Sequence, residues 1–142
     1  MSSKNAGIKG LSKFYFAFSL LFGIYLITHG HISHGAGIAG GVIIFLGSLQ
    51  ALLVTGSGAL SKVINKDNAK FTALAGITTT LLLALFGYLN GNGFMADFLP
   101  AGQPFELLSG GAAVLHNISL CVSVFGCLWL MALGILGVNS KD

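Results

Sequence analysis

Residues 36–54 read AGIAGGVIIFLGSLQALLV, an apolar run that contains no Asp, Glu, Lys or Arg. A helix needs about 20 mostly apolar residues to cross the hydrocarbon core of a bilayer. The strands of a membrane barrel would alternate apolar and polar side chains, whereas this run is apolar on every face. The run therefore predicts a transmembrane helix.

Three further runs have the same character, and none of them contains a charged residue. The sequence thus predicts an all-α membrane protein with a single domain over residues 1–142. Its four transmembrane helices are expected at about 14–32, 36–54, 71–89 and 112–138. A short turn makes the first two helices an antiparallel hairpin, and residues 90–111 connect the last two into a second hairpin.

The composition excludes several classes of protein. The chain is 54% hydrophobic and 8% charged, whereas a soluble domain carries about 25% charged residues. A soluble globule and a disordered chain are therefore excluded. Because the net charge of +3 comes from scattered lysines rather than a basic patch, no nucleic-acid partner is expected. We expect a multi-pass protein of the cell membrane, with the lipid bilayer around it.

The lysines predict the orientation of the helices. They lie before the first run, between the second and third, and after the fourth, at positions 4, 9, 13, 62, 66, 70 and 141. The positive-inside rule places these segments, and therefore both termini, in the cytoplasm. Lysines ahead of an apolar run also resemble a signal peptide. Because the run ends in Thr28-His29-Gly30-His31 rather than a small-residue cleavage site, we expect an uncleaved first helix.

Small residues are concentrated in the second run. Gly37 and Gly41 form a GxxxG pair, and Ala36 and Gly40 form a second pair at the same spacing. Small residues let transmembrane helices approach closely. Such pairs can pack within the four-helix unit or dock against another membrane protein. A small chain with 21 glycines and 11 phenylalanines offers few internal surfaces, which favours a subunit of a larger complex.

Four histidines are the most conspicuous polar residues. His29, His31 and His34 flank the first outer turn, and His116 precedes Asn117 near the outer end of the fourth helix. Imidazoles can bind metal ions, pair as haem ligands, handle protons, or bond free backbone carbonyls at the membrane interface. No cysteine or carboxylate adjoins the first three. We predict no metal site, no cofactor and no catalytic residue.

Ionisable residues are absent from the middle of every predicted helix. Proton and ion paths through membranes use buried Asp, Glu, Lys or His. The strongest polar groups at depth are Ser19, Gln50 and Thr78–Thr80, so the main charge relay is expected in a partner. Asp97 and Glu106 lie in the second outer loop, either as solvated charges or as groups that attract cations to an entrance.

Two stretches resemble the signature of the MnhB/MrpB family. Residues 29–41 read HGHISHGAGIAGG, and their Gly-His matches the family's Gly-His ahead of a Pro-Gly-Gly-Gly-Phe run. In that run His34 stands in place of Pro, Ala36 replaces the middle Gly, and Ile38 replaces Phe. The second stretch, PFELLSGG at 104–111 followed by LHNI at 115–118, is similar to the family's segment before its last helix.

The resemblance implies a function. Members of the family are small four-helix subunits of multisubunit Na+/H+ antiporters of the Mrp/Mnh type, and related subunits occur in membrane-bound hydrogenase and sulfane reductase complexes. In these assemblies large antiporter-like subunits carry the proton relay, and the small subunit sits in the region assigned to sodium movement. The resemblance therefore implies a non-catalytic subunit with large and small membrane partners and with Na+ and H+ as ions. In an assembly of the hydrogenase type it also implies a hydrogenase-like peripheral arm as a partner.

The candidate site residues follow from the glycine run and the histidines. For the ion pathway or for subunit packing they are His29, His31, His34, Gly35, Gly37, Gly40, Gly41, His116 and Asn117, with Asp97 and Glu106 as outer-loop acids. Two alternatives stay open. One is a membrane anchor that binds haem or quinone for a redox enzyme, and the other is a small homo-oligomeric metal or solute channel.

We predict that Gly37→Leu and Gly41→Leu each disrupt assembly of the parent complex, because the turn at residues 31–41 is expected to pack against a neighbouring subunit near an ion or water pathway. Native gels and transport assays of both variants test this. Intact assembly with normal transport in both variants would contradict it.

Overall fold

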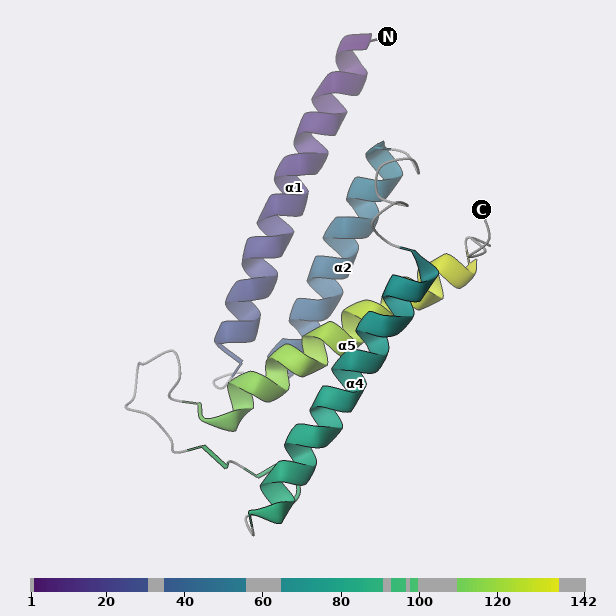
Figure 1. Cartoon of the computed structure of the whole chain (residues 1–142). Coiled ribbons are helices and arrows are strands. Elements are labelled where there is room, and N and C mark those ends of the chain that lie inside the picture. The colour runs from purple at the N-terminus through teal and green to yellow at the C-terminus, as the bar shows by residue number, and fades with distance from the viewer. Residues whose placement is uncertain are drawn as a thin grey trace.

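The computed structural model describes residues 2–30, 35–55, 65–90, 93–96, 98–99 and 110–135. Within them the chain forms four helices and no strand (Figure 1): α1 Ser2–Thr28, α2 Ala36–Thr55, α4 Lys66–Leu89 and α5 Ala112–Ile135. Each of the four is long and apolar enough to cross a membrane. The predicted all-α membrane fold is confirmed.

The bounds of two helices differ from the expected ones. α1 begins at Ser2 rather than at residue 14, because the segment before the apolar run is helical as well. α1 ends at Thr28, before the expected residue 32, because the chain tightens into a turn in which the Gly30 N–H donates to the Ile27 carbonyl at 3.3 Å. α4 begins at Lys66 rather than at residue 71. Helical hydrogen bonding continues past the apolar stretch, so the charged residues extend the helix beyond the lipid-compatible segment.

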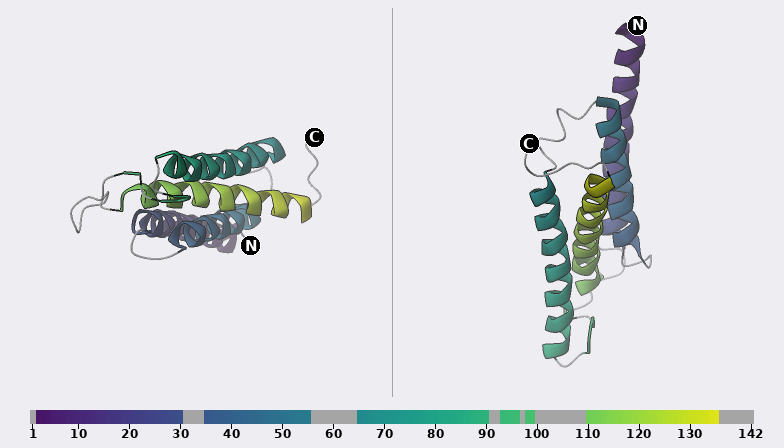
Figure 2. Two further views of the ribbon diagram at one scale, coloured as in Figure 1. Left: turned by 90° about the horizontal axis from the view of Figure 1, so that it is seen from below. Right: turned by 90° about the vertical axis from the view of Figure 1, so that its right-hand side faces the viewer.

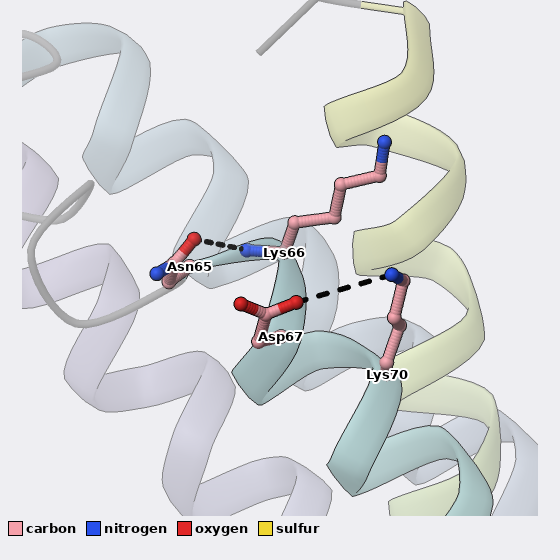
Figure 3. Close-up of polar contacts among 4 residues, drawn as sticks. All are labelled: Asn65, Lys66, Asp67 and Lys70. Atoms are coloured by element: carbon pink, nitrogen blue, oxygen red, sulfur yellow. Dashed lines mark hydrogen bonds and ion pairs between the residues drawn. The ribbon is translucent and has the colours of Figure 1, made fainter. Parts of the chain in front are cut away.

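Side chains at the start of α4 explain its early beginning (Figure 3). The Asn65 Oδ1 accepts a hydrogen bond of 2.7 Å from the Lys66 N–H, which satisfies one of the helix's free donors. Asp67 lies in the first turn, where a negative charge complements the helix dipole. Its contact with Lys70, 3.9 Å long and exposed on both sides, adds little.

The helices pack as two hairpins, and α5 of the second hairpin contacts both helices of the first. α1 pairs with α2, α4 pairs with α5, and α5 also contacts α2 and α1. Within the described part of the chain, α4 makes no helix contact except with α5. Figure 2 shows the result as layers, with α5 between α4 and the α1–α2 pair. The two predicted hairpins are confirmed, whereas the cytoplasmic position of the termini stays a prediction.

Glycines set the spacing of the α1–α2 hairpin. A Cβ atom on Gly40 would lie 3.0 Å from the Gly23 carbonyl oxygen, and one on Gly47 would lie 2.6 Å from the Cβ of Ser19. Such distances leave no room for a side chain. The absence of a side chain therefore lets α1 and α2 approach at backbone distance.

The α4–α5 contact also depends on small residues. A stripe of small residues along α4 is buried: Ala69, Ala73, Gly76, Ala84 and Gly87. Gly87, at the end of this stripe, lies against the backbone of Gly93 and Ala96 rather than against α5. A Cβ atom on Gly76 would overlap the backbone of Ser123, and one on Gly126 would overlap the backbone of Ala73. The two helices therefore interlock through reciprocal glycine contacts.

One aromatic residue ties three helices together. Trp129 of α5 is 1% exposed and meets Phe45 of α2 edge to face, with ring centroids 5.4 Å apart. The same buried cluster includes Ala69 of α4. Edge-to-face pairs of this kind add to the stability gained by close packing.

We predict that Gly126→Ala lowers the stability of the fold by about 1–3 kcal/mol, because the added methyl group forces the α4 and α5 backbones apart. Gly134→Ala on the same helix is the control, since a Cβ there meets nothing within 4 Å. Thermal unfolding in detergent should show a loss for Gly126→Ala alone. Equal unfolding temperatures for the two variants would contradict the reciprocal glycine contact.

Candidate functional site

The candidate residues gather where α1 ends, α2 begins and α5 begins. His29 follows the last residue of α1, Gly35 precedes α2, and Gly37, Gly40 and Gly41 lie in its first turns. His116 and Asn117 lie in the first turns of α5. The other candidates, His31, His34, Asp97 and Glu106, lie outside the described residues.

Asn117 is the centre of this cluster. Its Oδ1 accepts a hydrogen bond of 3.2 Å from the Gly37 N–H, and the side chain is buried. The first N–H groups of a helix have no partner within the helix, and a membrane supplies no water to bond them. Asn117 of α5 therefore caps α2 from another helix. A Cβ on Gly30 would overlap the Asn117 amide, so the same side chain also fits against the turn after α1.

The glycines of α2 face two different helices. A Cβ on Gly37 would lie 2.5 Å from the Asn117 carbonyl oxygen, and one on Gly41 would lie 2.8 Å from the Cys121 carbonyl oxygen, both on α5. Gly40 faces α1 instead, as the α1–α2 contact requires. In the described chain these three glycines serve contacts within the chain. A role for them in the ion pathway stays a prediction.

Gly35 has a different reason to be glycine. Its φ is +80°, a conformation that side chains disfavour, and a Cβ there would meet nothing within 4 Å. Its carbonyl accepts the Ala39 N–H at 3.0 Å. The residue thus redirects the chain into α2.

His29 is held against Tyr25. The two ring centroids are 4.2 Å apart, and the His29 Nδ1 lies 3.0 Å from the Tyr25 carbonyl oxygen. Because a carbonyl oxygen can only accept, Nδ1 donates in this contact, and Nε2 keeps its lone pair in the neutral ring. The contact orients one half-buried imidazole at the end of α1, whose Nε2 makes no hydrogen bond to the described residues.

The His116 ring, unlike that of His29, is not held by a hydrogen bond to the described residues. Both of its ring nitrogens are buried, and neither has a hydrogen-bond partner in the part of the chain that the structure describes. Its backbone carbonyl accepts the Ser119 Oγ hydroxyl at 2.9 Å, and that oxygen lies 2.9 Å from the Thr80 Oγ1 of α4. A buried imidazole without a partner in a membrane helix is a candidate for function.

The described residues contain no group of three or more His, Cys, Asp or Glu side chains that could hold a metal ion. The His29 and His116 rings share no hydrogen bond, since neither ring nitrogen of His116 has a partner among the described residues. The cluster therefore offers two separate imidazoles and a capped helix start, a set suited to hydrogen bonding and proton exchange.

Some residues of the site were not among the candidates. Gly30 fits against Asn117, and Thr80 pairs with Ser119 across the second hairpin. The sequence carries a partial signal for the pair, because both hydroxyls lie on helices that run antiparallel in one hairpin. No sequence pattern indicates that the Gly30 turn and Asn117 meet, since α5 reaches them only through the tertiary packing.

We predict that Asn117→Ala lowers stability by about 1–3 kcal/mol, because it leaves the Gly37 N–H buried without an acceptor. Hydrogen exchange of the first amides of α2 should become faster. Asn90→Ala is the control, because the Asn90 side chain bonds the Phe86 carbonyl at an exposed helix end. Unchanged exchange at Gly37 in Asn117→Ala would show that the cap contributes nothing.

Comparison with known proteins gives one match. The family model described as a domain related to the MnhB subunit of Na+/H+ antiporter matches residues 8–130. No curated protein and no solved structure matches significantly. The matched segment includes α1 from residue 8 onward, all of α2 and α4, and most of α5. With its four apolar helices, this chain is a multi-pass plasma membrane protein and belongs to the MnhB family.

Proposed function

We propose that this chain is a non-catalytic subunit of a multisubunit Na+/H+ antiporter module and helps to build its sodium and proton translocation region. The observation that carries the proposal is the family match over residues 8–130. Large antiporter-like subunits and further small subunits would be its membrane partners.

The distribution of charge supports dependence on partners. Within residues 14–30, 35–55, 71–90 and 110–135, the chain has no Asp, Glu, Lys or Arg. Relays that move protons through membranes use such residues at depth. The two described histidines lie near one end of the fold, at the end of α1 and the start of α5. The main relay would therefore lie in another subunit.

The candidate site supports a place at the translocation region. His116 presents buried ring nitrogens without partners, and His29 keeps Nε2 free. The half-buried His29 ring could bond water or a neighbouring subunit at the end of the fold that we predict to face outward, whereas the His116 ring nitrogens are enclosed within the chain. The proposal assigns these groups, the start of α2 and Asn117 to the edge of an ion or water pathway.

The wider assembly can be of two kinds. A stand-alone antiporter and a redox-driven sodium pump of the membrane-bound hydrogenase type would both use such a subunit. Nothing in the residues of this chain identifies a redox arm, so only the partners distinguish the two assemblies.

The test is purification of the tagged chain from native membranes in mild detergent, with mass spectrometry of every retained protein. We expect large antiporter-like subunits to be recovered. Their recovery alone indicates a stand-alone antiporter, and additional iron–sulfur or nickel subunits indicate a redox-driven pump. The control is an unrelated tagged membrane complex that survives the same procedure intact.

Recovery of the chain alone, while the control complex stays intact, would overturn the proposal and favour a small channel. A haem absorption band in the purified sample would instead support a redox anchor. In membrane vesicles, deletion of the chain should abolish Na+/H+ exchange by the complex, and the intact gene should restore it.

A further inference from the structure

A cavity lies among all four helices, toward the end of the fold at which α1 and α4 begin (Figure 1). Its volume is about 400 Å³, and its lining is almost entirely apolar, including Phe16, Leu20, Ile44 and Phe125. In the described chain α4 contacts neither α1 nor α2, so no packed pair of helices closes the cavity between α1 and α4. The cavity can therefore take up a molecule from the bilayer.

The cavity begins at the edge of the membrane. The apolar runs of α1 and α4 start at Phe14 and Phe71, each directly after a lysine. The cavity is lined by Phe16 on α1 and by Thr72 on α4. At 1.5 Å per residue, both walls are within about 3 Å of the start of these runs. Headgroups and the first carbons of acyl chains occupy this depth in a bilayer.

A second hollow follows on the same side of α4, nearer the middle of the membrane. Its volume is about 310 Å³, and it lies between α4 and α5, with Leu83 and Ile118 in its lining. From Phe71 to Leu83 the helix rises about 18 Å, close to half of the roughly 30 Å hydrocarbon core. The two hollows thus have the depth of one leaflet, which is the reach of an acyl chain rather than of a membrane-crossing helix.

Two lysines lie on the cavity side of α1. Lys13 precedes the cavity residue Phe16 by three residues and Lys9 precedes it by seven, so all three lie on one face of the helix. Both lysines are exposed, and neither forms an ion pair with the described residues. Asp67 is the only acidic residue in the described part of the chain, and it already contacts Lys70. A negative group at the mouth of the cavity would therefore meet two uncompensated positive charges.

These features together suit a phospholipid with a negative headgroup. The apolar lining matches an acyl chain, and the lysine side chains are long enough to bring their ammonium groups to a phosphate at the membrane surface. Basic sites between transmembrane helices bind anionic headgroups in this way. A headgroup with its own ammonium group, such as phosphocholine, has no net charge and gains less from the two lysines.

We propose that this cavity binds one anionic phospholipid, with an acyl chain between the helices and the headgroup at Lys9 and Lys13. The proposal requires a membrane but no partner subunit, so it goes beyond the proposed function and does not rest on it. The bound lipid would fill the space that α4 leaves beside the α1–α2 hairpin.

Lys70 is the control for the two lysines. It lies two residues from Asn68 and from Thr72, which both line the cavity, and residues two apart point to nearly opposite sides of a helix. Lys70 is exposed, as Lys13 is, and its substitution by Gln removes the same charge. The variants therefore differ in the side of the helix from which the charge is lost.

The first experiment reconstitutes the tagged chain, with every subunit that it retains, into vesicles of phosphatidylcholine and phosphatidylglycerol in equal parts. One of the two lipids carries a photoreactive diazirine on its acyl chain, and mass spectrometry identifies the labelled peptides. We expect phosphatidylglycerol to label the cavity segments of α1 and α5 more strongly than phosphatidylcholine does.

The lysine variants test the headgroup contact in the same vesicles. Lys13→Gln should lower the preference for phosphatidylglycerol roughly fivefold, which corresponds to about 1 kcal/mol, and Lys9→Gln should lower it further. Lys70→Gln should leave the preference unchanged. Equal labelling of the cavity by the two lipids would overturn the proposal, as would an equal loss of preference in Lys13→Gln and Lys70→Gln.

The second experiment fills the cavity, and Thr72 and Thr78 of α4 are the matched pair. The Thr72 hydroxyl donates to the Asn68 carbonyl at 2.8 Å and the Thr78 hydroxyl to the Leu74 carbonyl at 2.7 Å. Thr72 lines the cavity, whereas Thr78 lines neither hollow. The two substitutions therefore remove the same kind of local bond and differ at the cavity.

Thr72→Trp should exclude the acyl chain and reduce labelling of the cavity segments by both lipids, whereas Thr78→Trp should leave the labelling unchanged. Equal unfolding temperatures of the two variants show that the fold is intact. Undiminished labelling in Thr72→Trp would overturn the proposal. Because none of these readouts measures transport or subunit recovery, failure of the lipid site leaves the antiporter function standing.

Discussion

Backbone contact at glycines holds α5 between α4 and the α1–α2 hairpin, and the rest of the fold depends on it. Gly37 and Gly41 of α2 meet α5 on one side, while Gly76 and Gly126 close the contact between α4 and α5 on the other. In a bilayer the hydrophobic effect does not press helices together, because lipid is as apolar as the side chains. Dispersion contacts at short range do so, and any side chain at these positions would prevent them.

The candidate site is a consequence of this close contact. Only because α2 lies at backbone distance from α5 can Asn117 reach the Gly37 N–H, and only because residue 30 is glycine can the turn after α1 fit against the same amide. One side chain thus joins three helices at one end of the fold. The ring nitrogens of the neighbouring His116 have no such partner among the described residues. Asn117 therefore has a structural role, whereas the role of the His116 ring is not assigned.

The helices differ in how much of their surface lies against the rest of the chain. α5 contacts each of the other three helices, whereas α1 and α4 each keep a broad outer surface of large apolar side chains. The apolar segments contain no charged residue, and much of their surface is not covered by the rest of the chain. Such a surface is well suited to a place between other membrane subunits. Family membership agrees with this arrangement.

The sequence by itself determined the number and type of the helices and their order in hairpins, because the length of an apolar run shows whether the whole segment can enter lipid. The glycine-rich stretch at 29–41 and the stretch at 104–118 indicated the family. The sequence also singled out Gly37, Gly40 and Gly41, but not Gly76 or Gly126. It did not decide which helix each glycine meets, that Asn117 caps a helix 80 residues away, or that α4 begins at Lys66. These depend on distances between segments remote in sequence and on a local cap. The summed hydrophobicity of a segment contains no information on such distances or on caps. The contacts between remote segments were therefore decided only by the tertiary structure, and the start of α4 only by the cap at Asn65.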